Sequence, residues 1–407
     1  MGWVTPEAPK PEELSACIQC GLCLPVCPTF RLTGDEVASP RGRLTAMSAV
    51  ADGIAEVDDT FHEIMSFCLQ CRACEPACPS LVPFGRAMEG ARAEIAAQLP
   101  SAKTSLRQSL LGRRGLGSGG AVRGITRLAA LGQLAEADRW LPGRLKKPIA
   151  GLRRLGLRST SVIGQTHRPK GTPVATVGLL AGCVMDSWFP EVHKATIATL
   201  VAAGYAVSVP ESQSCCGALA AHDGAVDEAK ALAGTALQAF RDVDLVVSDA
   251  AGCGAHLKEL GHWASGGRDF SSKVRDVTEL VAESISVGRL PRLAERGVSV
   301  AIQDPCHLRH AQRIVAEPRD LLRAGGYTVL EIDPNGMCCG AAGLYSVLRP
   351  ETSSELGDRK AAQVMATGAR IVASANPGCE MQLRSSLGSG FRVAHPVELY
   401  AEAVGLV

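Results

Sequence analysis

The sequence predicts an α/β protein in which a mainly helical N-terminal domain is followed by a duplicated domain built on parallel sheets. Three observations lead to this prediction. Two four-cysteine runs lie near the N-terminus, and short β-branched runs alternate with Ala- and Leu-rich stretches from residue 174 onward. This alternation occurs twice, each time with a similar arrangement of cysteines. With 407 residues, the chain is long enough for two or three domains, each with its own core.

The sixteen cysteines divide the chain, because none lies between Cys78 and Cys183. We expect a domain at 1–99 that holds the two runs and a helical linker at 100–173. Two cysteine-rich repeats should follow, at 174–290 and 291–407. A helix is expected between the two N-terminal runs, around 43–54.

Both N-terminal runs read C-x-x-C-x-x-C-x-x-x-C-P, as CIQCGLCLPVCP and CLQCRACEPACP. Three thiolates two residues apart can surround one face of a cubane, and in two-cluster ferredoxins the fourth cysteine ligates the other cluster. A ferredoxin-like domain with two [4Fe–4S] clusters is thus predicted. One cluster is expected on Cys17, Cys20, Cys23 and Cys78, and the other on Cys68, Cys71, Cys74 and Cys27. Gly21 and Ala73 are small enough to let backbone N–H groups approach the sulfurs.

The alternative for these runs is a pair of zinc sites, which also use four cysteines. Zinc ribbons normally pair two C-x-x-C knuckles and need neither a third close cysteine nor a following proline. The spacing therefore favours iron–sulfur clusters.

The two repeats are predicted from their strands and cysteines. Strands are expected at 174–180, 206–209 and 244–248, and again at 298–302, 327–332 and 370–373, with helices at 193–203, 318–324 and 359–367. The cysteines are Cys183, Cys215, Cys216 and Cys253 in the first repeat and Cys306, Cys338, Cys339 and Cys379 in the second. In each repeat, 31 residues separate the first cysteine from a CCG triplet. We expect the adjacent thiols at strand ends, where ligands collect in open α/β sheets.

The linker is strongly basic. Residues 101–170 hold 15 Lys or Arg and only two acids, Glu136 and Asp138, so the rest of the chain carries 12 net negative charges. Basic amphipathic helices, which bind acidic protein surfaces or anionic lipid, are compatible with its leucines. These are Leu110, Leu111, Leu128, Leu131, Leu134 and Leu141. The alternative is a spacer that packs across the acidic halves of its own chain.

Seven stretches resemble a known family: GDEVASPRGRL (34–44), AGCVMDSWFPEVHKAT (181–196), ESQSCCGALAAHDG (211–224), AAGCGAHLKEL (250–260), DPCHLRHAQRI (304–314), MCCGAAGLYSV (337–347) and NPGCEMQL (376–383). The CCG motifs resemble the cysteine-rich domains of heterodisulfide reductase-type proteins. The full combination resembles the iron-sulfur subunit of glycolate oxidase and, more distantly, that of anaerobic glycerol-3-phosphate dehydrogenase.

This resemblance implies an electron-transfer subunit of a glycolate (2-hydroxy acid) oxidase complex. It would accept electrons from an FAD-containing partner subunit and pass them to a quinone or another acceptor. Substrate oxidation itself is expected on the partner chain, and no catalytic residue is assigned in this one. The rivals are a subunit for glycerol-3-phosphate or lactate oxidation, a stand-alone disulfide-reducing enzyme, and a structural or regulatory metal-binding module.

One departure from the heterodisulfide reductase pattern concerns ligand number. That pattern has C-x-x-C as the last motif of each repeat, giving five cysteines for a non-cubane cluster, whereas Ala250 and Asn376 stand at the first of those positions here. Four thiolates per repeat suit a further [4Fe–4S] cluster by count, although adjacent ligands are awkward on one cubane. The alternatives are buried thiols or a redox disulfide within each CC pair.

Polar residues close to the cysteines are further candidates. His222, His256 and His307 could be ligands or proton relays, although such histidines are more often hydrogen-bond donors to ligands or satisfied core groups. Asp186 and Asp304 could tune a cluster potential, but we expect plain surface carboxylates.

Composition excludes other classes of function. The formal net charge of +1 and an aromatic content of 4% do not indicate a nucleic-acid partner. The sequence contains no run of 18 apolar residues, so it does not predict a transmembrane helix. The N-terminus does not resemble a secretory signal. We therefore expect a cytoplasmic protein, with peripheral contact at the inner face of the cell membrane as an option. Cytosolic thiols are kept reduced, so the cysteines are expected to be metal ligands or redox groups.

Overall fold

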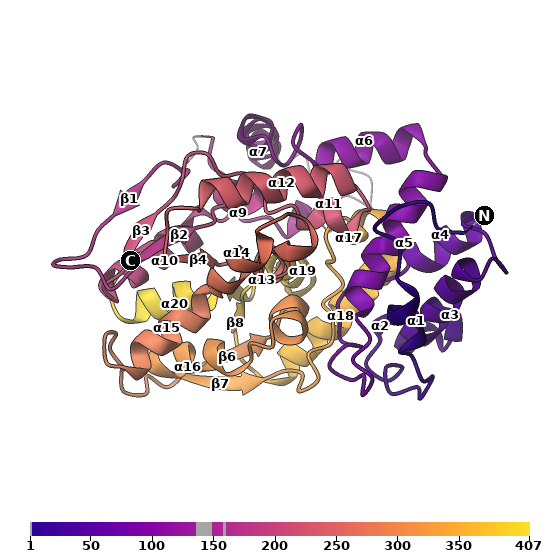
Figure 1. Cartoon of the computed structure of the whole chain (residues 1–407). Helices are drawn as coiled ribbons and strands as arrows, with labels where there is room; N and C mark the ends of the chain where they lie inside the picture. Colours follow the sequence, from indigo (N-terminus) through magenta and orange to yellow (C-terminus); the bar gives the residue numbers. More distant parts are fainter. Residues whose placement is uncertain (1, 136–148, 158–159) are drawn as a thin grey trace.

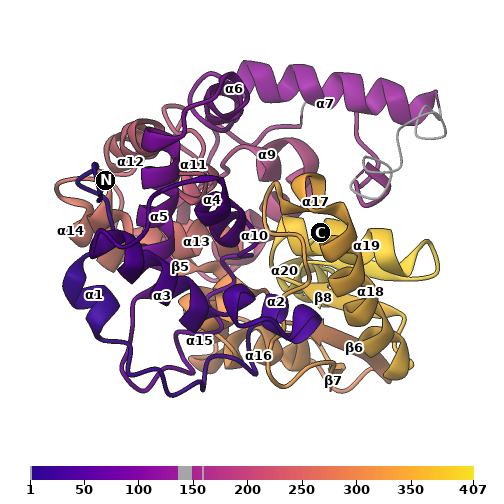
Figure 2. The same cartoon turned by 90° about the vertical axis from the view of Figure 1, so that its right-hand side faces the viewer.

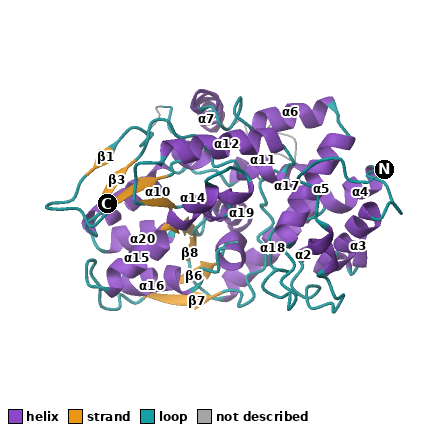
Figure 3. Cartoon of the chain, in the orientation of Figure 1, coloured by secondary structure: helices purple, strands orange, loops and turns teal. Residues whose placement is uncertain are grey.

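The computed structural model describes residues 2–135, 149–157 and 160–407. It divides into a helical N-terminal part and an α/β part with two separate sheets (Figure 1, Figure 3), which confirms the predicted fold class.

The N-terminal part packs its helices around one apolar core. The helices are α1 (Pro11–Ser15), α2 (Pro28–Thr33), α3 (Pro40–Ala51), α4 (Asp59–Ser66) and α5 (Phe84–Gln98), with a short 3-10 helix at Glu36–Ala38. Met47, Met65 and Met88 are fully buried in this core, and half-buried cysteines of both runs pack against it. The cysteine loops therefore rest on a rigid helical base.

The helix expected between the two runs is α3, which begins and ends three residues earlier than predicted. Its start is fixed by Ser39, whose hydroxyl accepts a hydrogen bond from the Gly42 N–H at 2.9 Å, and by Pro40 in the first turn. Gly42 must be glycine here, because a Cβ would lie 2.1 Å from the Glu36 carbonyl oxygen.

The described part of the basic linker contains α6 (Ala102–Leu111) and α7 (Gly119–Leu134), which run along one edge of the molecule (Figure 2). Leu111 is buried, whereas Leu110, Leu128, Leu131 and Leu134 are exposed. Glu136, Asp138 and Leu141 lie outside the described residues. The described part of the linker thus contains two helices, with leucines on its outer face.

The first sheet has the strand order β1 (Thr166–His167), β3 (Ala206–Ser208), β2 (Thr176–Leu179), β4 (Leu245–Ser248) and β5 (Val274–Asp276). All its pairings are parallel except that of β1 with β3. The valines that fill these strands suit a sheet covered on both faces. Strand β1 lies within 100–173, the range predicted to be a linker.

The second sheet repeats this arrangement. Its order is β7 (Tyr327–Glu331), β6 (Val298–Gln303), β8 (Ile371–Ser374) and β9 (Arg392–Ala394), with all pairings parallel. Strands β3-β2-β4-β5 therefore correspond to β7-β6-β8-β9, and the predicted duplication is confirmed.

Helices cover both sheets and join the repeats. In the first repeat they are α9 (Val184–Trp188), α10 (Pro190–Ala202), α11 (Ala218–His222), α12 (Val226–Ala239), α13 (Ala251–Lys258), α14 (Gly267–Lys273) and α15 (Val277–Ser286). In the second they are α16 (Ala316–Ala324), α17 (Tyr345–Leu348), α18 (Pro350–Ala366), α19 (Pro377–Leu387) and α20 (Pro396–Ala403), with a π-helical turn at His307–Ala311.

Helices α16 and α20 bury residues on two sides. Leu321 and Tyr400 belong to the core of the first repeat, while Leu322 and Leu399 pack against the second sheet. Helix α10 accordingly contacts α20, and α15 contacts α16. The two repeats share one continuous interior.

Candidate metal centres

The four cysteines of the first repeat converge at the carboxyl ends of its parallel strands. Cys183 follows β2, Cys215 and Cys216 follow β3, and Cys253 lies in α13 after β4. The Cys183 Sγ lies 3.4 Å from the Cys215 Sγ, and the Cys216 Sγ lies 3.1 Å from the Cys253 Sγ. The sulfurs therefore form a row in the order 183, 215, 216, 253, at the sheet edge where we expected them.

The second repeat forms an equivalent row. Cys306 follows β6, Cys338 and Cys339 follow β7, and Cys379 lies in α19 after β8. The Cys339 Sγ lies 3.2 Å from the Cys379 Sγ, and the thiol of Cys306 hydrogen-bonds to that of Cys338.

Proton sharing within each row shows how the thiols interact. Hydrogen bonds from Cys183 and Cys216 lower the pKa of Cys215 well below its usual value, while the bond to Cys215 and burial raise the pKa of Cys183. In the second row, bonds from Cys338 and Cys379 lower the pKa of Cys339 in the same way. Each row thus favours a thiolate at one of its inner sulfurs.

This donor set fits an iron–sulfur cluster. Buried thiolates need cationic metal to compensate their charge, and cluster sulfurs are typically stabilised by hydrogen bonds from backbone N–H groups. Such donors are present, since the Gly340 N–H lies 3.4 Å from the Cys338 Sγ and the Gln70 N–H lies 3.3 Å from the Cys68 Sγ. A cluster held there would supply one-electron transfer.

Four cysteines of the N-terminal part are more deeply buried than the others. Cys68, Cys71, Cys74 and Cys27 are buried, Cys17, Cys23 and Cys78 are half-buried, and Cys20 is exposed. Burial raises the pKa of Cys71 and Cys74, and the nearby charge of Cys27 raises both further. The charge of Cys27 in the first run thus acts on two thiols of the second run and also on Cys23 of its own run.

The two loops share a backbone conformation that the sequence does not reveal. The residues before and after the second cysteine have positive φ in both: Gln19 (56°) and Gly21 (81°), then Gln70 (51°) and Arg72 (61°). Arg72 therefore occupies the position of Gly21, while Ala73 is buried one residue later. Arg72 is held by ion pairs to Glu75 at 2.8 Å and to Glu259 at 2.7 Å.

The second N-terminal run lies directly against the second repeat. Cys71, Leu69, Cys338 and Tyr345 belong to one buried cluster, with Cys306 at its margin. After burial, the charge of Cys306 is the largest influence that raises the pKa of Cys71. The three cysteines thus connect the two parts of the chain.

The three histidines lie at this junction or close to it. The rings of His222 and His307 stack at 5.4 Å, the Nε2 of His307 lies 3.1 Å from the Gln70 carbonyl oxygen, and the Nδ1 of His222 lies 3.0 Å from Glu89. Burial lowers the pKa of His222 and His307 to about 3 and that of His256 to about 4. All three are neutral near pH 7, and the Nε2 of His256 has no hydrogen-bond partner among the described residues.

The expectation that Asp186 and Asp304 are surface carboxylates is wrong. Asp186 is 7% exposed and accepts hydrogen bonds from Ser161 and Val162, whereas Asp304 is 6% exposed and forms ion pairs with Arg309 and Arg319. Asp304 directly follows β6, whereas Asp186 lies in α9, three residues after Cys183. Both carboxylates hold the segment next to a cysteine in place.

Three described cations of the linker bind acids of the α/β part. Arg107 pairs with Asp223 at 2.8 Å, Arg113 with Glu228 at 3.2 Å, and Arg153 with Glu380 at 2.6 Å and Glu398 at 2.7 Å. This is the arrangement expected of a spacer that packs on its own acidic halves.

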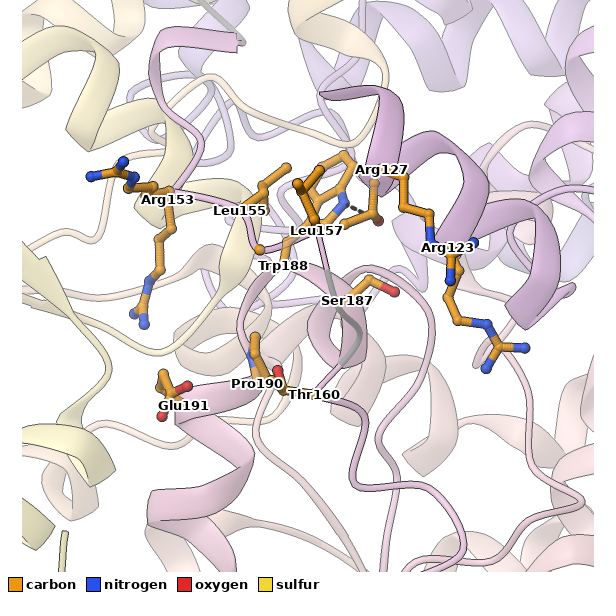
Figure 4. A pocket seen from close by; sticks show the side chains of 13 residues that line it. Arg123, Arg127, Arg153, Leu155, Leu157, Thr160, Ser187, Trp188, Pro190 and Glu191 are labelled. Atoms are coloured by element: carbon orange, nitrogen blue, oxygen red, sulfur yellow. Dashed lines mark hydrogen bonds between the residues drawn. The ribbon is translucent and has the colours of Figure 1, made fainter. Parts of the chain in front are cut away.

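A pocket that the sequence did not indicate lies between α7 and the start of the first repeat (Figure 4). It has a volume of about 220 Å³ and is lined by Arg123 and Arg127 of α7, Leu155 and Trp188. The Trp188 Nε1 donates a hydrogen bond to Thr126 at 3.0 Å, which fixes the indole ring. None of the described cysteines lines this pocket.

Two other features are absent from residues 2–135, 149–157 and 160–407. No three His, Cys, Asp or Glu side chains are grouped around the position of a single metal ion. No helix in the same ranges has the length and apolar character needed to cross a membrane.

Comparisons with known proteins agree with the site. A 4Fe-4S dicluster domain matches residues 13–101, and a cysteine-rich domain matches residues 177–258 and 300–384. The chain is 34% identical to "Probable glycolate oxidase iron-sulfur subunit" of Bacillus subtilis (strain 168), over 97% of this chain and 94% of that protein. It is 28% identical to "Glycolate oxidase iron-sulfur subunit" of Escherichia coli (strain K12), over 96% of this chain and 94% of that protein.

A shorter relative is "Lactate utilization protein A" of Bacillus subtilis (strain 168), with 28% identity over 55% of this chain and 98% of that protein. The matches that span nearly the whole chain confirm the resemblance drawn from the motifs. The chain is an iron–sulfur protein and belongs to the family of glycolate oxidase iron-sulfur subunits.

Proposed function

We propose that this chain is the electron-transfer subunit of a 2-hydroxy acid oxidase complex, with glycolate as the substrate of an FAD-containing partner subunit. The observation that carries the proposal is the buried contact of Cys71 with Cys306 and Cys338. It joins the N-terminal cysteine sites to the cysteine row of the second repeat without an intervening layer of protein. Electrons received at one part can therefore reach the other and then a quinone or another acceptor.

The proposed ligands are the sixteen cysteines named from the sequence. Two [4Fe–4S] clusters are assigned to the N-terminal part, and a further cluster to each row in the repeats. Iron and acid-labile sulfide analysis of anaerobically purified protein tests this assignment. Two cubanes account for about eight irons per chain, so clearly more than eight is the expected result, and about eight would mean that the rows are empty.

The function is tested by coexpression with candidate flavoproteins and purification under nitrogen. The FAD-containing subunit should co-purify, and glycolate should bleach the iron–sulfur absorbance of the complex. Lactate and glycerol-3-phosphate are supplied in parallel, because relatives of this chain include a lactate utilization protein. Bleaching by lactate or glycerol-3-phosphate instead of glycolate would reassign the substrate. If none of the flavoproteins reduces the clusters, the proposed function is contradicted.

A stand-alone disulfide-reducing enzyme is less compatible with the site. The positions of the fifth cysteines hold Ala250, which is buried, and Asn376, which binds the backbone of the other repeat. Turnover of small disulfides without any flavoprotein would favour that alternative.

Peripheral membrane contact is the second part of the proposal, and α6 and α7 support it. Leu128 is 71% exposed and Leu131 52%, and Arg123 and Arg127 lie beside them on the exposed surface of α7. Exposed apolar residues beside cations are what an interfacial helix needs to bind anionic lipid. Sedimentation with phosphatidylglycerol vesicles should pellet the wild type at low salt, and should not pellet Leu128→Glu/Leu131→Glu. If the wild type does not pellet with the vesicles, the proposed membrane contact is wrong.

A further inference from the structure

The first cysteine run forms an exposed loop, unlike the second. Cys20 is exposed, and its apolar neighbours Ile18 and Leu22 are 67% and 56% exposed. In the second run the residues that correspond to Ile18 and Cys20 are Leu69 and Cys71, which are 6% and 9% exposed. The two halves of the N-terminal part therefore differ in what covers them, although their cysteine spacing is the same.

The cover on the second run is the second repeat itself. Leu69 and Cys71 pack against Cys338, Tyr345 and Leu356 of that repeat. A site held by the second run can thus exchange electrons inside the chain. A site held by the first run reaches solvent at the Cys20 loop, and another molecule must approach that loop for electrons to enter or leave there, because transfer rates fall steeply with distance.

The exposed loop is held in place. The Arg41 Nη1 donates to the Gln19 carbonyl oxygen at 2.9 Å, and the Arg41 Nε donates to Glu36 at 2.7 Å. Beside Glu36, Val37 is 46% exposed. Ile18, Leu22 and Val37 therefore form an apolar surface around Cys20 with a charged pair at its edge, which we call the Cys20 surface. An apolar centre with a polar rim is the usual anatomy of a protein interface.

We propose that the Cys20 surface is the docking site of the flavin-bearing electron donor. The inference rests on the proposed function and adds the place at which the partner binds. In the transfer step one electron leaves the reduced flavin of the partner, which is oxidised, and enters the site held by Cys17, Cys20 and Cys23, which is reduced. No bond is formed or broken in this chain, and the electron continues inward through the second run to Cys306 and Cys338.

Charge favours a protein over a membrane as the occupant. Residues 1–99 contain seven Lys or Arg and thirteen Asp or Glu, so this domain is acidic while the linker is basic. An acidic domain is repelled by anionic lipid. An apolar, neutral or basic patch on a protein would complement the Cys20 surface, and small interfaces of this kind are typical of electron-transfer encounters.

The test uses the full chain with its clusters and the FAD-containing subunit that co-purifies with it. The variant is Ile18→Glu/Leu22→Glu, and the matched control is Ile54→Glu. Ile54 is 80% exposed in the same domain. It lies beyond the C-terminal end of α3, whose N-terminal end contains Arg41, so the length of this helix, about 18 Å, separates Ile54 from the Arg41 end of the Cys20 surface. Stopped-flow absorbance follows cluster reduction by the glycolate-reduced flavoprotein at increasing flavoprotein concentration. Dithionite reduction and the EPR spectra report whether the clusters are intact.

We expect the double variant to raise the half-saturating flavoprotein concentration about tenfold or more, as charges at the centre of an interface do. Ile54→Glu should behave as the wild type, and all three proteins should be reduced equally by dithionite. If the double variant loses its first cluster, Val37→Glu, which lies outside the ligand loop, replaces it with the same expected result.

The other outcomes are distinct. Equal half-saturation for the wild type and the double variant, with intact clusters, overturns the docking site and leaves the proposed function standing. A flavoprotein that fails to reduce even the wild type contradicts the proposed function itself. If the double variant loses binding to phosphatidylglycerol vesicles while its reduction by the flavoprotein is unchanged, the surface contacts lipid and the inference is wrong.

Discussion

The side-chain oxygen of Asn376 accepts a hydrogen bond from the backbone N–H of Gly252 at 3.1 Å, across the boundary between the two repeats. A second bond, from the Ala251 N–H to the Ala375 carbonyl oxygen at 3.1 Å, lies beside it. The heterodisulfide reductase pattern has a cysteine at the position of Asn376. In this chain the position joins the repeats, and its amide nitrogen lies 3.7 Å from the Cys379 sulfur.

Asn376→Ala should weaken the boundary between the repeats. It leaves the Gly252 N–H without its acceptor, which costs about 1 kcal/mol and lowers Tm by about 2–4 °C in differential scanning calorimetry. Asn376→Asp keeps an acceptor oxygen and should lose less. Equal losses in the two variants would show that this hydrogen bond is not what stabilises the boundary.

Arg153→Met should be strongly destabilising. Arg153 binds Glu380 and Glu398, whose side chains are 2% and 9% exposed, so its removal leaves two buried carboxylates without a counter-charge. We expect a loss of about 3–5 kcal/mol in the free energy of unfolding at pH 8, and a smaller loss at pH 5, where the carboxylates can take up protons. Arg384→Met is the control, because Arg384 lies 4.0 Å from the same Glu380 and is more exposed. Similar losses for the two variants would contradict the special role of Arg153.

Cys27→Ser should damage the cluster of the second run. The charge of Cys27 raises the pKa of both Cys71 and Cys74, in agreement with the crossed ligand assignment. EPR signals of the two clusters can be assigned beforehand from Cys20→Ser and Cys71→Ser. Cys78→Ser should then affect the cluster of the first run. Loss of the first-run signal in Cys27→Ser would mean that each run holds its own cluster.

Asp276 should make stability depend on pH. Its Oδ1 accepts hydrogen bonds from Thr278 and caps α15, but its Oδ2 has no partner among the described residues. Burial raises the pKa of Asp276 to about 7. The folded state therefore binds a proton that the unfolded state releases near pH 4, so the contribution of this carboxyl to stability decreases between pH 4 and pH 7 and stays low above pH 7.

Asp276→Asn keeps an N-cap oxygen and cannot ionise. Its Tm relative to wild type should rise between pH 5 and pH 8. A difference in Tm that is constant over this range would show that Asp276 does not titrate in it.

Strands and cysteine rows were predictable because both depend on local patterns. The valine-rich runs placed six strands to within two residues, and the CCG triplets fixed which cysteines meet. Helix α18 begins nine residues earlier than expected, because its first turns are polar and only Leu356 and Val364 farther along the helix carry the apolar pattern. Strands β1, β5 and β9 were missed because two or three residues are too few for any periodicity.

The rest of the site depends on contacts between distant segments. The approach of Cys71 to Cys306 joins residues more than two hundred positions apart, and no spacing rule relates them. Asp186 and Asp304 were misjudged for the same reason, since Ser161 and Arg319, which bind them, follow no motif.

The shared interior of the repeats has a consequence for folding. Val397, Tyr400 and Ala401 of α20 complete the core that contains Val177 and Leu200 of the first repeat. A fragment that lacked α20 would leave apolar side chains of the first repeat uncovered, so we expect the two repeats to unfold together as one cooperative unit.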